Sequence, residues 1–126
     1  METVTSETIT LTSYEGTASN VTIPDSIEGK KVTKLAKNCF EGNYSIQNVT
    51  IPATVKSVEG YAFIDCGNLK TVTFSGMSTH VDNDFARQCG DNVKVYCYLY
   101  SATYYDITYD YPMDYLGIHI TFDKTS

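Results

Sequence analysis

The side chains in this sequence that are best suited to catalysis or metal binding are thiols and imidazoles. It contains four cysteines and two histidines, which are Cys39, Cys66, Cys89, Cys97, His80 and His119. The cysteines lack the Cys-x-x-Cys spacing that is typical of zinc sites. Cys66 and Cys89 each stand directly before a glycine, in similar surroundings, which favours burial as reduced thiols. A disulfide, for example between Cys89 and Cys97, is the alternative, and zinc is the least favoured interpretation.

Neither histidine lies near a catalytic motif. No Gly-x-Ser-x-Gly or His-Glu-x-x-His sequence stands around His80 or His119, and these are the patterns that mark hydrolase and metalloprotease sites. A cysteine–histidine catalytic pair would rest on no motif. We therefore expect His80 to be a solvated loop residue. The sequence predicts no catalytic residue, no cofactor and no enzyme activity.

Two groups of aspartates supply the oxygen ligands that calcium prefers. Neither group has the Asp-x-Asp-x-Asp-Gly order of an EF-hand loop. Asp106, Asp110 and Asp114 are spaced four residues apart, so Asp106 and Asp110 would share one face of a helix. We favour solvated acidic rims over calcium sites, and we predict no metal ligand. The two groups are Asp82, Asp84 and Asp91, and Asp106, Asp110 and Asp114.

Tyrosine is concentrated near the C-terminal end, where eight of the eleven tyrosines fall between residues 96 and 115. A tyrosine ring has an apolar face and a polar tip, which suits protein interfaces and stacking on sugars. One interpretation is that these rings pack the end of the fold. The other is a recognition surface, for which Tyr98, Tyr100 and Tyr105 are the candidates.

Charge and hydropathy exclude several classes of partner. The net charge is −6, from 15 acidic and 9 basic residues, which disfavours binding to nucleic-acid phosphate. No apolar run approaches the roughly 20 residues of a membrane helix, so we expect no membrane insertion. The start, METVTSETIT, is polar and lacks a signal peptide. The protein is then cytoplasmic, or the chain is a piece of a secreted protein, and the repeats described next favour the second.

Similar segments recur along the chain and organise it. They begin with VTIP at Val21, VTIP at Val49, VTFS at Val72 and VKVY at Val93, which gives periods of 28, 23 and 21 residues. A hairpin-like insertion at 28–31 explains the long first period. The loss of one residue on each side of Phe85 would explain the short third period. Periods of this length are typical of leucine-rich repeats.

Apolar residues recur at equivalent positions of these segments. One repeat cannot bury its own apolar side chains, but stacked repeats bury them against one another. The sequence therefore predicts one continuous core. Its members are Val21, Val49, Val72 and Val93; Ile23, Ile51, Phe74 and Val95; Leu35, Val58 and Val81; Phe40, Phe63 and Phe85; and Ile46 and Leu69.

A polar residue stands between the two apolar positions of each predicted strand. Alternation with a period of two sends it to the opposite, solvent-facing side. We expect these side chains to line up as a ladder on the sheet surface and to serve as a binding face. They are Thr22, Thr50, Thr73 and Lys94.

Both ends of the stack need caps, because a terminal repeat otherwise exposes an apolar face. Ile9 and Leu11 alternate with threonines and predict a capping strand. Ser101 is placed to cap a helix from Ala102 to about Asp110. Alternation at Leu116, Ile118, Ile120 and Phe122 predicts a last strand. We therefore expect one domain, 1–126, with an N-terminal cap at 1–20, repeats at 21–97 and a tyrosine-rich cap at 98–126.

The repeat pattern resembles the BspA-like leucine-rich repeat family. The resemblance rests on VTIPDSI with VTKL and CF, and above all on VTIPATVKSVEGYAFIDCGNLKTVTF. It covers roughly residues 8–110. Cys39 stands where Ala62 does, Asn43 replaces the repeat cysteine, and Ser75 replaces the proline of the third unit. The resemblance implies a mainly β solenoid with little helix, in which three to four repeats are stacked between caps.

The same resemblance implies a function, because members of this family are mostly extracellular or surface-attached proteins of bacteria and some protozoa. We expect a non-catalytic, secreted or cell-surface module for protein–protein interaction or adhesion, carried on a larger chain. The alternatives are a carbohydrate-binding module that uses the surface tyrosines, and a structural spacer. The expected partner is a host or bacterial surface protein, with carbohydrate second and nucleic acid excluded.

Overall fold

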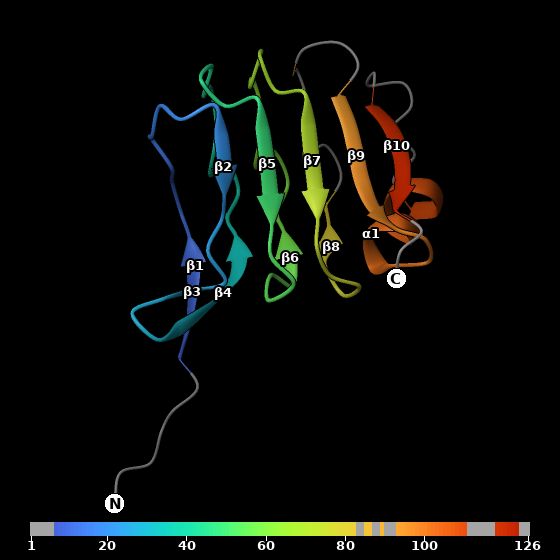
Figure 1. Ribbon diagram of the computed structural model, residues 1–126, viewed down its shortest axis with the longest axis horizontal. Helices are drawn as coiled ribbons and strands as arrows, with labels where there is room; N and C mark the ends of the chain where they lie inside the picture. The colour runs from blue at the N-terminus through green and yellow to red at the C-terminus, as the bar shows by residue number, and fades with distance from the viewer. Residues whose placement is uncertain (1–6, 83–84, 87–88, 90–92, 111–117, 124–126) are drawn as a thin grey trace, which may run out of the picture.

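The computed structural model describes residues 7–82, 85–86, 89, 93–110 and 118–123. These residues form a β-solenoid of about four turns, mostly strand, with a short helix near the C-terminal end (Figure 1). The predicted solenoid fold is thus confirmed. Two sheets run along the stack, and we call them the front sheet and the back sheet, as they lie in Figure 1.

The front sheet is parallel throughout, because each coil adds its strand in the same direction. Along the sheet, the order is β10, β9, β7, β5 and β2. The strands are β2 (Asn20–Thr22), β5 (Asn48–Ile51), β7 (Thr71–Phe74), β9 (Val93–Tyr98) and β10 (Ile118–Asp123).

The back sheet has shorter strands in the order β1, β4, β6 and β8, and these also pair in parallel. A further strand, β3, pairs with β4 in an antiparallel hairpin. The strands are β1 (Thr8–Leu11), β3 (Ser26–Ile27), β4 (Lys30–Leu35), β6 (Ser57–Val58) and β8 (His80–Val81). The predicted cap strand is therefore β1, and the predicted hairpin insertion is formed by β3 and β4.

The register of the front sheet corrects the predicted repeat boundaries. Val49 pairs with Val72, and Val72 pairs with Val95. Both steps are 23 residues, so the fourth unit is aligned on Val95 and not on Val93. The prediction of a third period of 21 residues is wrong.

The third unit has also lost no residue around Phe85. The Phe40 amide donates to the Ala62 carbonyl at 2.7 Å, and the Phe63 amide donates to the Phe85 carbonyl at 2.8 Å. Because these bonds are equivalent, Phe85 takes the place of Ala62, and Ala86 takes the place of Phe63. The third coil exchanges the order of a small and a large residue within an unchanged repeat length.

The core fills the space between the two sheets. The Phe40 and Phe63 rings stack with centroids 4.7 Å apart, and Tyr14 of the N-terminal cap packs on Phe40 at 5.0 Å. Phe85 instead meets Phe74 edge to face at 6.1 Å. Every predicted core residue is buried except Val21, which is half-buried on β2 at the edge of the front sheet. The predicted sharing of one core between repeats is confirmed.

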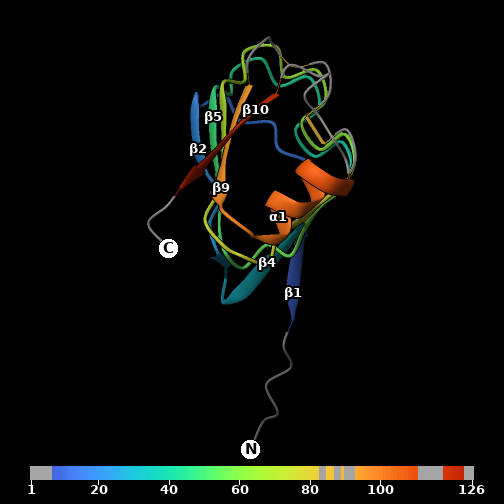
Figure 2. The ribbon, with the colours of Figure 1, turned by 90° about the vertical axis from the view of Figure 1, so that its right-hand side faces the viewer.

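The C-terminal cap lies across the last coil. Helix α1 (Ala102–Tyr105) continues as a π-helix, η1 (Asp106–Asp110), so the predicted helix is present in two forms. Figure 2 shows α1 against the end of the stack, where it contacts β8 and β9. The predicted last strand is β10, which pairs with β9; Leu116 lies outside the described residues.

Candidate functional site

The outward-facing residues of β2, β5, β7 and β9 form a polar surface that we call the ladder face. On β5 and β7, inward residues are buried and outward residues are half-buried. Thr22 pairs with Thr50, and Thr50 pairs with Thr73, so the three predicted threonines lie side by side in register. Thr22 is exposed because β2 is the edge strand of this sheet.

Lys94 is on the ladder face but is not the fourth member of the threonine row. Thr73 pairs with Tyr96, whereas Lys94 pairs with Thr71. The predicted position of Lys94 is therefore wrong by two residues. Its side chain is exposed, and it still faces outward because a shift of two residues keeps the same face of a strand.

A second polar row runs beside the threonines and was not predicted. Asn48 Nδ2 donates to Asn20 Oδ1 at 2.7 Å, and Thr71 Oγ1 donates to Asn48 Oδ1 at 2.7 Å. Lys94 continues this row by its pairing with Thr71. The signal was present in the sequence, since an asparagine precedes both copies of Val-Thr-Ile. These hydrogen bonds fix the side chains and reduce the entropy that a binding event would cost.

The predicted tyrosines fall into two places. Tyr98 is half-buried and ends β9, on the same side of the strand as Lys94 and Tyr96. Tyr100 and Tyr105 belong to a separate group at the turn into α1, which we call the tyrosine cluster. The predicted site residues therefore do not gather at one point.

The tyrosine cluster consists of Tyr100, Tyr104 and Tyr105. Tyr100 meets Tyr104 edge to face at 5.5 Å and lies nearly parallel to Tyr105 at 6.2 Å. Its backbone has a φ of 67°, which is uncommon for a residue other than glycine. Tyr100 is 62% exposed and Tyr105 is 43% exposed. The rings pack on one another, so both sequence interpretations, cap packing and an exposed aromatic surface, describe part of this cluster.

A shallow groove crosses the ladder face where the first strands end. It has a volume of about 460 Å³. Its lining includes Thr22 and Thr50 together with the segments that begin at Pro24 and Pro52. Pro52 follows β5 directly, as predicted, because proline cannot donate a ladder hydrogen bond, whereas Pro24 stands two residues after the last residue of β2. The groove could hold an extended or small polar ligand.

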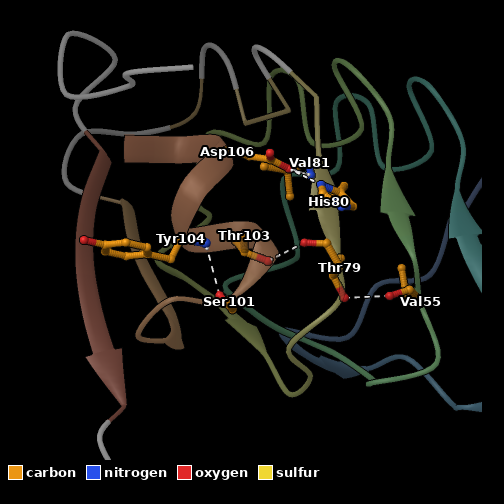
Figure 3. A network of polar contacts seen from close by, with 8 residues as sticks. All are labelled: Val55, Thr79, His80, Val81, Ser101, Thr103, Tyr104 and Asp106. Atoms are coloured by element: carbon orange, nitrogen blue, oxygen red, sulfur yellow. Dashed lines mark hydrogen bonds and ion pairs between the residues drawn. The ribbon is translucent and has the colours of Figure 1, made fainter. Parts of the chain in front are cut away.

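A chain of hydroxyl contacts ties the C-terminal cap to the coils beneath it (Figure 3). Thr79 Oγ1 donates to the Val55 carbonyl at 2.6 Å, and Thr103 Oγ1 donates to the Thr79 carbonyl at 2.7 Å. Ser101 accepts from the Tyr104 amide at 3.1 Å, as the predicted N-cap. Both threonines and Ser101 are buried, so these contacts serve packing and not recognition.

Asp106 closes the same network and corrects two predictions. Its carboxylate accepts from the Val81 amide at 2.9 Å and lies 3.0 Å from His80 Nδ1. Only 7% of Asp106 is exposed, so it is not part of a solvated acidic rim. His80 lies on β8 and not in a loop, although its side chain is 69% exposed. Asp114 lies outside the described residues.

The thiols show no catalytic arrangement among the described residues. His80 bonds to a carboxylate, and no thiol shares that contact. Burial raises the pKa of Cys39 to about 11 and also raises the pKa of Cys97, so both remain thiols at neutral pH. None of the four cysteines is in a disulfide, so Cys97 is not joined to Cys89.

The part of the chain that the structure describes contains neither a cluster of metal-binding side chains nor a membrane-spanning helix. No group of three or more histidine, cysteine or acidic side chains is placed to hold a metal ion there. Within those residues, no helix has both the length and the apolar character required to cross a bilayer.

One comparison with known proteins gives a match. The family model described as "BspA type Leucine rich repeat region" matches residues 4–104 with six copies. The matched region contains β1 and most of α1 as well as the coils between them. No curated protein and no solved structure gives a significant match.

Proposed function

Because this chain belongs to the BspA-type leucine-rich repeat family, we propose that it is a non-catalytic module that binds a protein partner through its ladder face. We further propose that it is carried on a secreted or surface-attached protein and acts in adhesion. Family membership supports a repeat module for interaction. The choice of surface and partner rests on the arguments that follow.

The regularity of the ladder face is the observation that carries this proposal. Thr22, Thr50 and Thr73 stand in register, beside the hydrogen-bonded row of Asn20 and Asn48. Short, fixed side chains lose little conformational entropy on binding and present closely spaced donors and acceptors. A partner with a complementary flat surface would meet an ordered set of hydrogen-bonding groups.

The C-terminal side of the ladder face adds aromatic area. Tyr96 pairs with Thr73, and Tyr98 follows on the same side of β9. Tyrosine is enriched among the residues that dominate interface energetics, because its ring buries much area while its hydroxyl forms a hydrogen bond. We therefore place the centre of the proposed contact near Thr73 and Tyr96, with Lys94 at its rim.

A carbohydrate-binding module is the second candidate. The exposure of Tyr100 and the groove beside Thr22 and Thr50 favour it. Flat aromatic faces suit stacking on sugar rings, and the groove offers hydroxyl groups for polar contacts. The two features lie at different places on the molecule, so they would form separate subsites. The protein-binding proposal needs only the single continuous ladder face.

The test begins with arrays of purified extracellular proteins and of glycans. The protein that binds is then titrated with Thr50→Arg and Thr73→Arg, which place a long charged side chain on the ladder face. Ser57→Arg on β6 is the matched control, because Ser57 is also a half-buried strand residue but lies in the back sheet.

The expected result is at least a tenfold loss of protein affinity for each threonine variant and no loss for Ser57→Arg. Equal affinities for all three variants would exclude the ladder face. Binding only to glycans, with a response of tyrosine fluorescence, would support the second candidate. An absence of binding on both arrays would leave the role of a structural spacer and contradict the proposal.

A further inference from the structure

Cys66 and Cys89 occupy equivalent positions on neighbouring coils. Cys66 Sγ donates to the Phe40 carbonyl at 3.1 Å, and Cys89 Sγ donates to the Phe63 carbonyl at 3.0 Å. Phe40 and Phe63 are themselves neighbours, with rings stacked at 4.7 Å. Both thiols therefore point the same way, one coil apart, and each lies close enough to influence the acidity of the other.

The spacing expected for this arrangement is compatible with a disulfide. Adjacent strands and coils that share ladder hydrogen bonds lie about 4.7–4.9 Å apart. That spacing falls within the range of roughly 4.4–6.8 Å seen between the Cα atoms of disulfide-bonded cysteines. The Phe63 amide bonds directly to the Phe85 carbonyl, so the coils that carry the two thiols are held together by such hydrogen bonds.

The two thiols differ in access and in acidity. Cys66 is completely buried, whereas Cys89 is partly exposed. The neighbouring Cys66 thiol lowers the pKa of Cys89. The neighbouring Cys89 thiol, together with burial, raises the pKa of Cys66. A partly exposed thiol whose pKa is lowered, beside a buried partner, is the arrangement of an attacking and a resolving cysteine.

We propose that Cys66 and Cys89 form a redox-active dithiol that closes into a disulfide between successive coils. The oxidant is a disulfide, either of glutathione or of a protein. The Cys89 thiolate attacks one sulfur of that disulfide and releases the first thiol. Cys66 then attacks Cys89 Sγ in the mixed disulfide and releases the second. The protein dithiol loses two electrons and two protons, and the two released thiols receive them.

The other cysteines have no equivalent neighbour among the described residues. Asn43 stands at this position in the preceding coil, where its Nδ2 donates to the Gly16 carbonyl at 3.1 Å. Cys39 lies in register with Ala62. Cys97 lies on β9, where Ser101 is its side-chain partner. The structure therefore selects one pair from four cysteines, and this pair differs from the Cys89–Cys97 alternative.

The experiment exposes the reduced full chain to glutathione buffers of increasing oxidised fraction. Free thiols are then trapped with N-ethylmaleimide after denaturation, and intact mass and peptide mapping identify the products. The variants are Cys66→Ser, Cys89→Ser and Cys97→Ser. Serine at position 66 can still donate to the Phe40 carbonyl, which preserves that contact. Cys97→Ser is the matched control, because it removes a buried cysteine outside the pair.

In the unmodified chain, we expect two thiols to be lost together, with the Cys66 and Cys89 peptides linked and Cys39 and Cys97 fully alkylated. Cys66→Ser should retain glutathione on Cys89 as a stable mixed disulfide. Cys97→Ser should behave as the unmodified chain does. A link that involves Cys39 or Cys97, or a lasting glutathione adduct on the unmodified chain, would overturn the proposal. So would four free thiols in the most oxidising buffer. Peptide mapping of the unmodified chain decides the question even if a variant does not fold.

Discussion

The amide of Phe63 donates a 2.8 Å hydrogen bond to the carbonyl of Phe85. This bond places Ala86, and not Phe85, opposite Phe63. The second coil reads Ala62-Phe63 and the third reads Phe85-Ala86, and all four residues are buried. The stack therefore keeps one large and one small side chain per coil while their order changes. Phe85 meets Phe74 of the front sheet instead of continuing the stack of Phe40 and Phe63.

In the third coil the large residue, Phe85, comes before the small one, Ala86. We predict that the effects of mutations at these two positions on stability are not additive. Phe85→Ala alone should cost about 3–5 kcal/mol, because it leaves a cavity. Ala86→Phe alone should cost about 1–3 kcal/mol through overpacking. The double variant restores the small-then-large order of the second coil. Its loss of stability should therefore be smaller than the sum of the losses of the two single variants. Urea unfolding monitored by circular dichroism measures all three. Strictly additive losses would show that the two positions do not share space.

The sequence was sufficient to predict the solenoid but not its full register. Val93 and Val95 both face the core, so a strand pattern of period two fits either alignment. A shift of two residues leaves every side chain on its own face, and hydrophobicity alone cannot detect it. The hydrogen bonds to neighbouring coils resolve this ambiguity, because Val95 pairs with Val72.

The candidate surface was predictable where it is periodic. The threonine row follows from alternation along each strand, and it is present in register. The environment of Asp106 was not predictable, because it bonds to residues 25 and 26 positions away in the sequence. Helical spacing placed Asp106 with Asp110 and gave no indication of β8. A contact of this kind depends on how the cap docks, which no local pattern encodes.

The two contacts of Asp106, with the Val81 amide and with His80, should contribute unequally to stability. Asp106→Ala removes the acceptor of the buried Val81 amide, and an unsatisfied buried donor costs about 1–3 kcal/mol. His80→Ala should change stability little, because the His80 side chain is largely exposed. Thermal unfolding of both variants in one buffer makes the comparison. A larger loss for His80→Ala than for Asp106→Ala would contradict this account.

Gly76 predicts a steric limit between coils. A Cβ atom at Gly76 would lie 2.8 Å from the backbone Cα of Ala53, which cannot move independently. Gly76→Ala should therefore destabilise the fold by about 1–3 kcal/mol. Gly67→Ala is the control, because its Cβ would meet only the exposed ring of Tyr44 at 3.3 Å. Chemical unfolding should separate the two variants, and equal stability would refute the close approach at Gly76.

The hairpin between β3 and β4 predicts a stabilising change. Glu28 has a φ of 53° and Gly29 has a φ of 81°, as required at the two central residues of a type I′ turn. Asparagine adopts this conformation more readily than glutamate, so Glu28→Asn should stabilise the protein by roughly 0.5 kcal/mol. Gly29→Ala should destabilise it by about 1 kcal/mol. Paired thermal melts test both signs, and destabilisation by Glu28→Asn would contradict the turn assignment.

Cys39 predicts a loss of stability at alkaline pH. Burial raises the pKa of Cys39 from 9.0 to about 11 in the folded protein. Between these values the unfolded chain gives up its thiol proton while the folded chain keeps it, so stability falls as pH rises. The fall should approach roughly 2–3 kcal/mol across this interval, at about 1.4 kcal/mol per pH unit. Below pH 9 the contribution is fully present.

The matched variant for this titration is Cys39→Ala, because alanine already occupies the equivalent position at Ala62. Other groups titrate in both proteins, so the difference between the two pH profiles isolates Cys39. Urea unfolding should be measured at intervals from pH 8 to pH 11 under reducing conditions. The variant should lose stability less steeply than the unmodified chain above pH 9. Parallel profiles would mean that the Cys39 thiolate is accommodated in the folded core, although only 2% of Cys39 is exposed.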